Sequence, residues 1–458
     1  MAAPTFRETN EQILQSLKMP SRRYLALLAV LALGIGWLGL CFGLQTFKGM
    51  GVTGLNSAVG WGTYITNFVF WIGIGHAGTL ISAILFLLRV EWRTAVARVA
   101  ETMTVFAVMT AGMFPMIHLG RVWVFYWLMP YPNTAHLWPN LKSPLLSDVV
   151  AVTTYLTVSV LFWYLGLIPD LAAVRDSATG RRKWIYGVLS MGWVGGNDQW
   201  RHYARAYTCM AALAAPLVIS VQSIVSWDFA VSILPGWHET IFAPYFVAGA
   251  IHSGLAMVIT LLIPLRSVLN LEKHIQRRHF EAMAALMVFT GLIVLYAYCV
   301  EPFMSWYGGH HAHRSLSMYR ATGAYAPYYW MMVGFNGVLP LAFLWRSLRR
   351  NWAVLFIIGI LINVGMWLER YVIIVTSQAH DYLPSAWHLY TPSWVEISIS
   401  IGAGCFFLFA LLVALRVIPA VALTETKAEM VEERHHGVAA EAAPTGVAGE
   451  PTEGEARL

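Results

Sequence analysis

Ten apolar stretches, each long enough to cross a lipid bilayer as a helix, dominate this 458-residue sequence. About 20 helical residues, rising about 1.5 Å each, span a hydrocarbon core of roughly 30 Å. Only 12% of the residues are charged, about half the share typical of soluble domains. The sequence therefore predicts an all-α integral membrane protein. The expected spans are 24–44, 59–88, 99–128, 149–169, 206–227, 241–265, 282–304, 324–345, 352–376 and 395–417.

The basic residues predict which side of the membrane each loop occupies. Most of the 30 Lys and Arg residues fall on one side, in the N-terminal segment, the C-terminal tail and four alternate loops. Because Lys and Arg mark the cytoplasmic side, we expect both termini to be cytoplasmic. The net charge of +6 thus reflects topology and gives no reason to expect nucleic acid as a partner.

An internal repeat indicates how the spans are grouped. His-Ala-Gly at 76–78 in the second span matches His-Ser-Gly at 252–254 in the sixth. The following spans begin with Glu-Thr-Met at 101–103 and Glu-Ala-Met at 281–283. Four spans separate the copies, so both cross in the same direction, as in transporters with parallel repeats. A chance similarity between two apolar segments is the alternative.

The repeat predicts two four-helix bundles, residues 59–228 and 229–376, built from spans two to five and six to nine. The first span with its outer loop (24–58) and the tenth span with its preceding loop (377–417) are expected at the periphery. Residues 1–23 form a cytoplasmic segment in this interpretation. The tail, 418–458, turns rich in Ala, Gly, Pro and Glu from about residue 425, and we expect it to be disordered.

Titratable side chains inside the expected spans are functional candidates, because an unpaired charge in a bilayer is costly. The third span runs outward and places His118 about 15 Å before its outer end. Arg121 follows at i+3, on the same helix face. Asp148 begins the fourth span and Asp228 ends the fifth, both at the outer side. We therefore expect His118, Asp148 and Asp228 to converge there, although Asp148 also fits a helix cap.

This predicted cluster suits a lipid-soluble substrate that loses protons during its reaction. An imidazole titrates near a pH of about 6.5, and it lies beside carboxyl groups at the rim of an apolar bundle. A hydroquinone could donate one proton to His118 and one to Asp148, while Arg121 stabilised the developing charge. The cluster therefore predicts a quinol site.

Further buried groups suggest a proton path. His76 and His252 lie at matching depths, and each is either a structural histidine that bonds across a helix interface or a proton relay. Glu301, Glu369 and Arg370 are the other candidates. Because neighbours on a helix point about 100° apart, Glu369 and Arg370 are not expected to pair.

The sequence offers no convincing metal or haem site. The four cysteines are isolated, which argues against iron–sulfur, structural zinc and disulfide frameworks. The histidines at 310, 311 and 313 have no acidic or cysteine partner nearby and are typical of adventitious metal binding. Two haem ligands need a common depth, yet His76 and His118 are expected to differ by about 10 Å.

The ten-span plan, the repeated unit and the stretch at 76–78 resemble the NrfD-like, or polysulfide reductase membrane-subunit, family. Leu-Lys-Met-Pro at 17–20 and Phe-Pro-Met-Ile-His-Leu-Gly-Arg at 114–121 are more narrowly similar to the ActC subunit of bacterial alternative complex III. The paralogous ActF subunit stays an alternative. The likeness covers about residues 15–420.

The resemblance implies a subunit of the bacterial cytoplasmic (inner) membrane that oxidises quinol, such as menaquinol, near the periplasmic side. Such a subunit holds no redox cofactor and works only within its complex. An iron–sulfur protein on the outer loops, haem c subunits, a second NrfD-like membrane subunit and lipids are the implied partners. The family's quinol-site histidine and aspartate match His118 and Asp148, with Asp228 as a third member, and a proton route through the bundles is also implied.

Two other functions fit a polytopic chain with an internal repeat. A secondary transporter should have spans broken by Gly or Pro at matching positions in both halves. The prolines at 115, 216, 264 and 340 do not match between the copies. A haem-bearing cytochrome is the second alternative.

Overall fold

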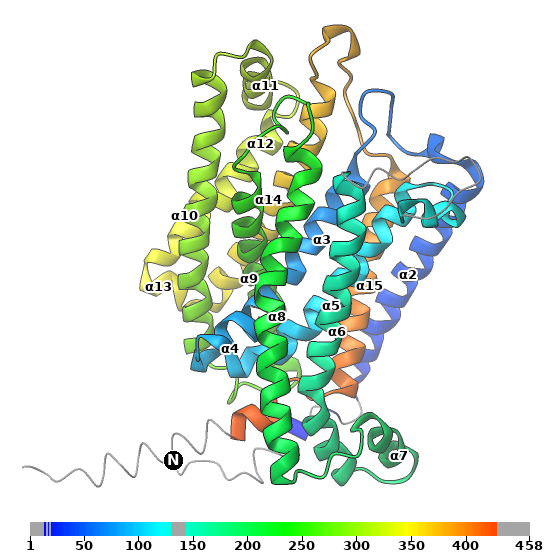
Figure 1. The fold of residues 1–458 in the computed structure, drawn as a ribbon, viewed down its shortest axis with the longest axis vertical. Coiled ribbons are helices and arrows are strands. Elements are labelled where there is room, and N and C mark those ends of the chain that lie inside the picture. Colours follow the sequence, from blue (N-terminus) through cyan, green and yellow to red (C-terminus); the bar gives the residue numbers. More distant parts are fainter. Residues whose placement is uncertain (1–12, 15–16, 18–19, 130–142, 428–458) are drawn as a thin grey trace, which may run out of the picture.

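The computed structural model describes residues 13–14, 17, 20–129 and 143–427. These residues form helices joined by turns and loops, with no strand in the described ranges (Figure 1). Most of the predicted N-terminal segment and the predicted tail beyond residue 427 lie outside them.

Nine helices in the described part of the chain are long and apolar enough to cross a membrane, which confirms an all-helical integral membrane architecture. The spanning candidates are α2 (Arg22–Lys48), α3 (Thr63–Thr79) with its continuation to Leu87, α5 (Thr94–His118), α6 (Pro144–Ser177), α8 (Asn197–Ala230), α9 (Phe242–Val268), α10 (Arg277–Tyr307), α14 (Trp352–Ala379) and α15 (Trp394–Val417). Shorter helices include α4 (Leu85–Leu87), α7 (Gly180–Leu189), α11 (His311–Thr322), α12 (Ala326–Val333) and α13 (Arg346–Arg349).

The count of ten spans is not confirmed, because the expected span 324–345 is not one continuous α-helix. It consists of α12, a π-helical turn at Gly334–Val338 and a 3-10 segment at Leu339–Leu344. Pro340 lies at the start of the 3-10 segment and has no N–H to donate. Only α12, its first part, is a regular α-helix, and α12 is shorter than the α-helices of the other spans.

Helices α3 and α9, which carry the two copies of the repeated motif, pack against each other in the interior. A Cβ placed on Gly254 would lie 2.3 Å from Cβ of Ala77, so the close approach of these helices requires glycine. Helix α3 also packs against α5 and α14, while α2 and α15 pair along one edge of the molecule (Figure 1). The division into two bundles stays a prediction.

The third span ends ten residues earlier than the sequence predicts. Helix α5 stops at His118, because Gly120 adopts a positive φ of 71° and its N–H bonds to the carbonyl of Ile117. A side chain at Gly120 would collide with Met50. His118 is therefore the last residue of its helix rather than about 15 Å inside it, and Arg121 lies beyond the helix, exposed.

The chain after α15 is packed against the helices. Ala420, Val421, Ala422 and Leu423 are at most 2% exposed. This differs from the predicted disorder from residue 418. We call this end of the molecule, where α2 begins and α15 ends, the inner end, following the topology predicted from the charges (Figure 1). The opposite end, where α5 and α8 terminate, is the outer end.

Candidate functional site

Three of the predicted side chains lie at the outer ends of adjoining helices. His118 ends α5, Asp148 lies in the second turn of α6, and Asp228 lies in the last turn of α8. Helix α6 packs against both α5 and α8. The order of these helices thus brings residues 118, 148 and 228 to one end of the molecule.

The carboxyl groups of Asp148 and Asp228 are neighbours across the contact between α6 and α8. Oδ1 of each aspartate and Nδ1 of His118 are buried with no hydrogen-bond partner among the described residues. Such atoms are costly to leave unpaired, so each of them is available to bond with a ligand. His118 lies at the same end of the molecule as the two aspartates, and no contact with either of them is found among the described side chains.

The capping alternative for Asp148 is wrong. The N-cap of α6 is Ser143, and Pro144 is the first helical residue. Asp148 therefore lies inside the helix, and its side chain is 6% exposed. Its role is to be sought in the contact with Asp228.

An apolar groove of about 400 Å³ runs between α6 and α8, and its lining includes Ser147, the neighbour of Asp148, but neither aspartate. A volume of this size is within the range of small-molecule sites. Most of its side chains are apolar, with hydroxyl groups from three residues. The groove is lined by Leu146, Ser147, Val150, Ala151, Thr154, Leu217, Ser220, Val221 and Ile224.

His76 and His252 are both buried near the interface of α3 and α9. Nδ1 of His76 is 2.5 Å from the carbonyl oxygen of Ile72, and Nδ1 of His252 is 3.0 Å from the hydroxyl of Thr290. Nε2 of each ring is buried with no hydrogen-bond partner among the described residues. Each histidine thus has one structural bond and one free ring nitrogen, so the geometry supports the structural interpretation and leaves the relay open.

Glu369 and Arg370 form an ion pair at 2.6 Å, although their positions on the helix predict that they point apart. The arginine side chain is long enough to turn back, and its guanidinium packs 4.2 Å from the ring centre of Phe246. Tyr298 donates a hydrogen bond to Glu369 and accepts one from Asn336 at 2.8 Å. The expectation that Glu369 and Arg370 do not pair is therefore wrong.

Glu301 pairs with Arg320 of α11. Arg320 is 4% exposed and also donates to the hydroxyls of Thr376 (2.7 Å) and Ser377 (3.0 Å) on α14. Glu301 thus fastens the outer helix α11 to the membrane core.

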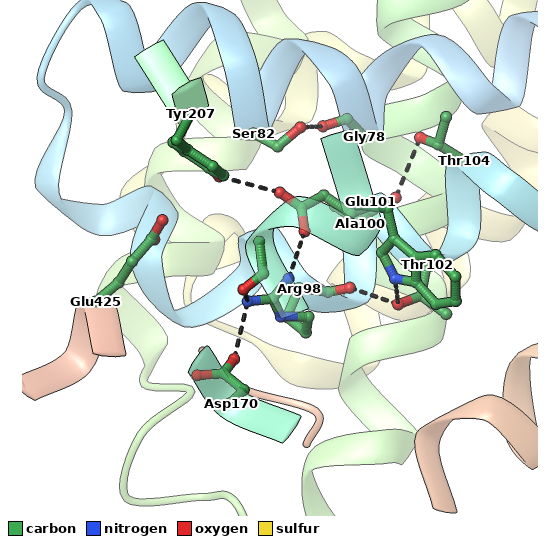
Figure 2. Close-up of polar contacts among 12 residues, drawn as sticks. Gly78, Ser82, Arg98, Ala100, Glu101, Thr102, Thr104, Asp170, Tyr207 and Glu425 are labelled. Atoms are coloured by element: carbon green, nitrogen blue, oxygen red, sulfur yellow. Dashed lines mark hydrogen bonds and ion pairs between the residues drawn. The ribbon is translucent and has the colours of Figure 1, made fainter. Parts of the chain in front are cut away.

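A buried polar cluster at the inner end was missed from the sequence. Arg98 donates to Glu101 at 3.0 Å and to Asp170 at 2.8 Å, and Tyr207 donates to Glu101 at 3.2 Å (Figure 2). Asp170 lies one residue past the expected fourth span, which was ended at the proline of position 169. Helix α6 in fact continues through that proline to Ser177.

Histidines gather around an open basin of about 660 Å³ at the outer end. No group of three or more His, Cys, Asp or Glu side chains in the described ranges has the geometry of a metal site. Burial lowers the pKa of His313 below its ordinary value, so this imidazole is neutral at neutral pH. The basin is lined by His238, His310, His311, Ala312, His313, Ser315, His380, Asp381, Tyr382, Pro384 and Trp387.

The sequence is similar to one known protein family and to two named proteins. The family model described as Polysulphide reductase, NrfD, matches residues 51–380. A Halobacterium salinarum protein named as a membrane subunit of dimethyl sulfoxide reductase is 25% identical over 431 residues, which cover 84% of this chain and 92% of that protein. A Mesobacillus selenatarsenatis protein named as a subunit of selenate reductase is 22% identical over 252 residues, which cover 53% of this chain and 56% of that protein.

Proposed function

The chain belongs to the polysulphide reductase NrfD family, and from this premise we propose that it is the quinol-oxidising membrane subunit of an electron-transfer complex. Membership of the family supports a redox role within an oxidoreductase complex. The pair of Asp148 and Asp228, at the end of the molecule where His118 also lies and with a groove open between the same two helices, is the observation that supports the finer assignment.

The chemistry of quinol oxidation fits the unpaired atoms of the outer cluster. A quinol that becomes a quinone releases two protons and two electrons. Nδ1 of His118 and a carboxylate oxygen of the aspartate pair can each accept one proton, because both atoms are buried without a partner. The electrons must leave the chain, and we assign them to an iron–sulfur partner on the outer side.

The groove between α6 and α8 suits the apolar tail of such a substrate. Its lining residues continue directly from the carboxyl pair, since Ser147 neighbours Asp148 and Ile224 lies one helical turn before Asp228. The head group would then reach the carboxyl groups while the tail lay between the helices. Arg121, exposed beyond the end of α5, is assigned a weaker role at the mouth of the site.

The proposal includes a wider assembly of the alternative complex III type. Haem c subunits would receive the electrons from the iron–sulfur partner, and a second NrfD-like subunit would pack within the bacterial inner membrane. His76, His252, Glu369 and Arg370 are the proposed inner members of a proton path, and Glu301 is its proposed outer member.

A bulky side chain in the groove tests the proposal. Ser220 lines the groove, whereas Ser223 on the same helix does not. In the purified complex we expect Ser220→Phe to raise the KM for quinol about tenfold, because about 1.4 kcal/mol of tail binding would be lost. Ser223→Phe is the matched control and should leave the KM unchanged. Equal KM values in both variants would refute the tail groove.

A further inference from the structure

The inner end holds a buried cluster of charges that the quinol site does not use. Arg98 is 3% exposed and bonds to Glu101 and Asp170, while Tyr207 bonds to the second oxygen of Glu101 (Figure 2). A Cβ on Gly166 would lie 2.9 Å from Nη1 of Arg98, so this glycine makes room for the guanidinium. Helices α5, α6 and α8 thus build the cluster together.

The segment after α15 completes the cluster from a distant part of the chain. Glu425 lies 3.2 Å from Nη2 of Arg93, and the backbone N–H of Thr424 lies 3.4 Å from Oδ1 of Asp170. The hydroxyl of Thr424 approaches the same oxygen at 3.5 Å. Because residues 420–423 are buried as well, this segment covers the inner face of the cluster.

The charges of this cluster do not balance. Two guanidinium groups, Arg93 and Arg98, face three carboxyl groups, those of Glu101, Asp170 and Glu425. Among the side chains that the structure describes, the other titratable groups that face them are the phenols of Tyr203 and Tyr207, which are neutral at ordinary pH. With all three carboxyl groups ionised, the cluster would carry one excess negative charge in a region shielded from water.

Unpaired polar atoms accompany this imbalance. Nε of Arg98 and Nη1 of Arg93 are buried with no hydrogen-bond partner among the described residues. Buried donors and acceptors of this kind are usually satisfied by ordered water. The cluster can therefore form hydrogen bonds to water, and such water could carry a proton to or from a carboxyl group.

We propose that the carboxyl groups of Glu101 and Asp170, beside the carboxyl group of Glu425, share one exchangeable proton at the inner end, and that residues 418–427 form the lid over this site. Uptake of a proton from water changes the charge of the cluster from −1 to 0. Lifting of the lid would remove Glu425 and Thr424 and expose Asp170 to the inner solution. The proposal concerns the inner end alone and does not depend on the quinol assignment.

The repeat supplies a control inside the same chain. Glu281 occupies the position in the second copy that Glu101 has in the first. Its side chain is 20% exposed and pairs with Arg350 at 2.8 Å, one carboxylate with one guanidinium. The surroundings of Glu281 therefore have no excess of carboxyl groups over guanidinium groups, and we infer no bound proton there.

Infrared difference spectroscopy of the purified complex at neutral pH tests the count of charges. In Glu425→Gln two carboxylates remain with two guanidinium groups, so the bound proton should leave. We expect the loss of one protonated carboxyl band with no net loss of carboxylate, since one remaining carboxyl group becomes ionised as Glu425 disappears. Glu281→Gln should lose one carboxylate and no protonated carboxyl. A Glu425→Gln spectrum that loses only a carboxylate would overturn the proposal.

The lid is tested by the rate at which this proton exchanges for deuterium. Thr424→Val removes the hydroxyl that approaches Asp170, and we expect exchange about fivefold faster, the factor for about 1 kcal/mol. Thr426→Val is the control, because the hydroxyl of Thr426 bonds only to the carbonyl of Ala422 in its own helical turn. Equal rates in both variants would show that residues 418–427 do not close the site.

Discussion

The two ends of the molecule hold buried carboxyl groups in opposite ways. At the inner end Glu101 and Asp170 each bond to Arg98, and Arg93 forms an ion pair with Glu425. At the outer end Asp148 and Asp228 are neighbours on α6 and α8, and each keeps a buried oxygen without a hydrogen-bond partner in the described structure. The inner carboxyl groups thus have guanidinium partners within the protein, while each outer aspartate keeps one oxygen available to a ligand.

The largest effect is expected when the inner end loses its central cation. Arg98→Met leaves Glu101 and Asp170 buried without the guanidinium group that pairs with them, and we expect the free energy of unfolding to fall by about 3–5 kcal/mol. Arg350→Met is the matched control at an exposed pair, with a cost below about 1 kcal/mol. Unfolding of the purified complex in denaturant measures both. Similar losses for the two variants would contradict the burial argument.

The outer end should tolerate the corresponding change far better. Asp228→Asn removes no cation, and the new amide can still donate a hydrogen bond to Asp148, so we expect a stability change below about 1 kcal/mol. The same unfolding measurement applies. A loss as large as that of Arg98→Met would mean that the outer pair is a structural element and not a site kept open for a ligand.

A pH-dependent effect is expected at Glu239, in the outer loop before α9. Burial, and then the charge of Glu301, raises the pKa of Glu239 from 4.5 to about 7. The folded chain thus holds a proton that the unfolded chain releases, so stability falls as the pH rises from about 4.5 to about 7. Glu239→Gln removes this penalty. Its melting temperature should match that of wild type at pH values near 4 and exceed it slightly near pH 8, and an equal difference at both would contradict the assignment.

The sequence predicts the membrane class and the family because both rest on long patterns that local structure does not disturb. Apolar stretches locate all the long helices, and the family assignment is confirmed. The predicted end of the third span was wrong because the aromatic residues after His118 are as apolar as the helix before it. Only the positive φ of Gly120 ends the helix there, and hydropathy does not detect it.

The candidate site was predicted in part for a similar reason. The helix order sufficed to bring Asp148 and Asp228 to one end, since both lie at span ends. The ion pair of Glu369 with Arg370 and the cluster around Arg98 depend on how long side chains bend and on contacts between distant segments. Asp170 and Glu425 are 255 residues apart in the chain, and nothing in their local sequence indicates that they share one cluster.

The central claim is that the outer cluster accepts the protons of a quinol. Quinol-dependent electron transfer in the purified native assembly tests it directly, with His118→Ala and Asp148→Asn compared with wild type after both variants are shown to assemble. We predict a loss of turnover of about a hundredfold or more in each, the range of positioned acid and base groups. Unchanged turnover in both variants would contradict the account and make transport the next function to test.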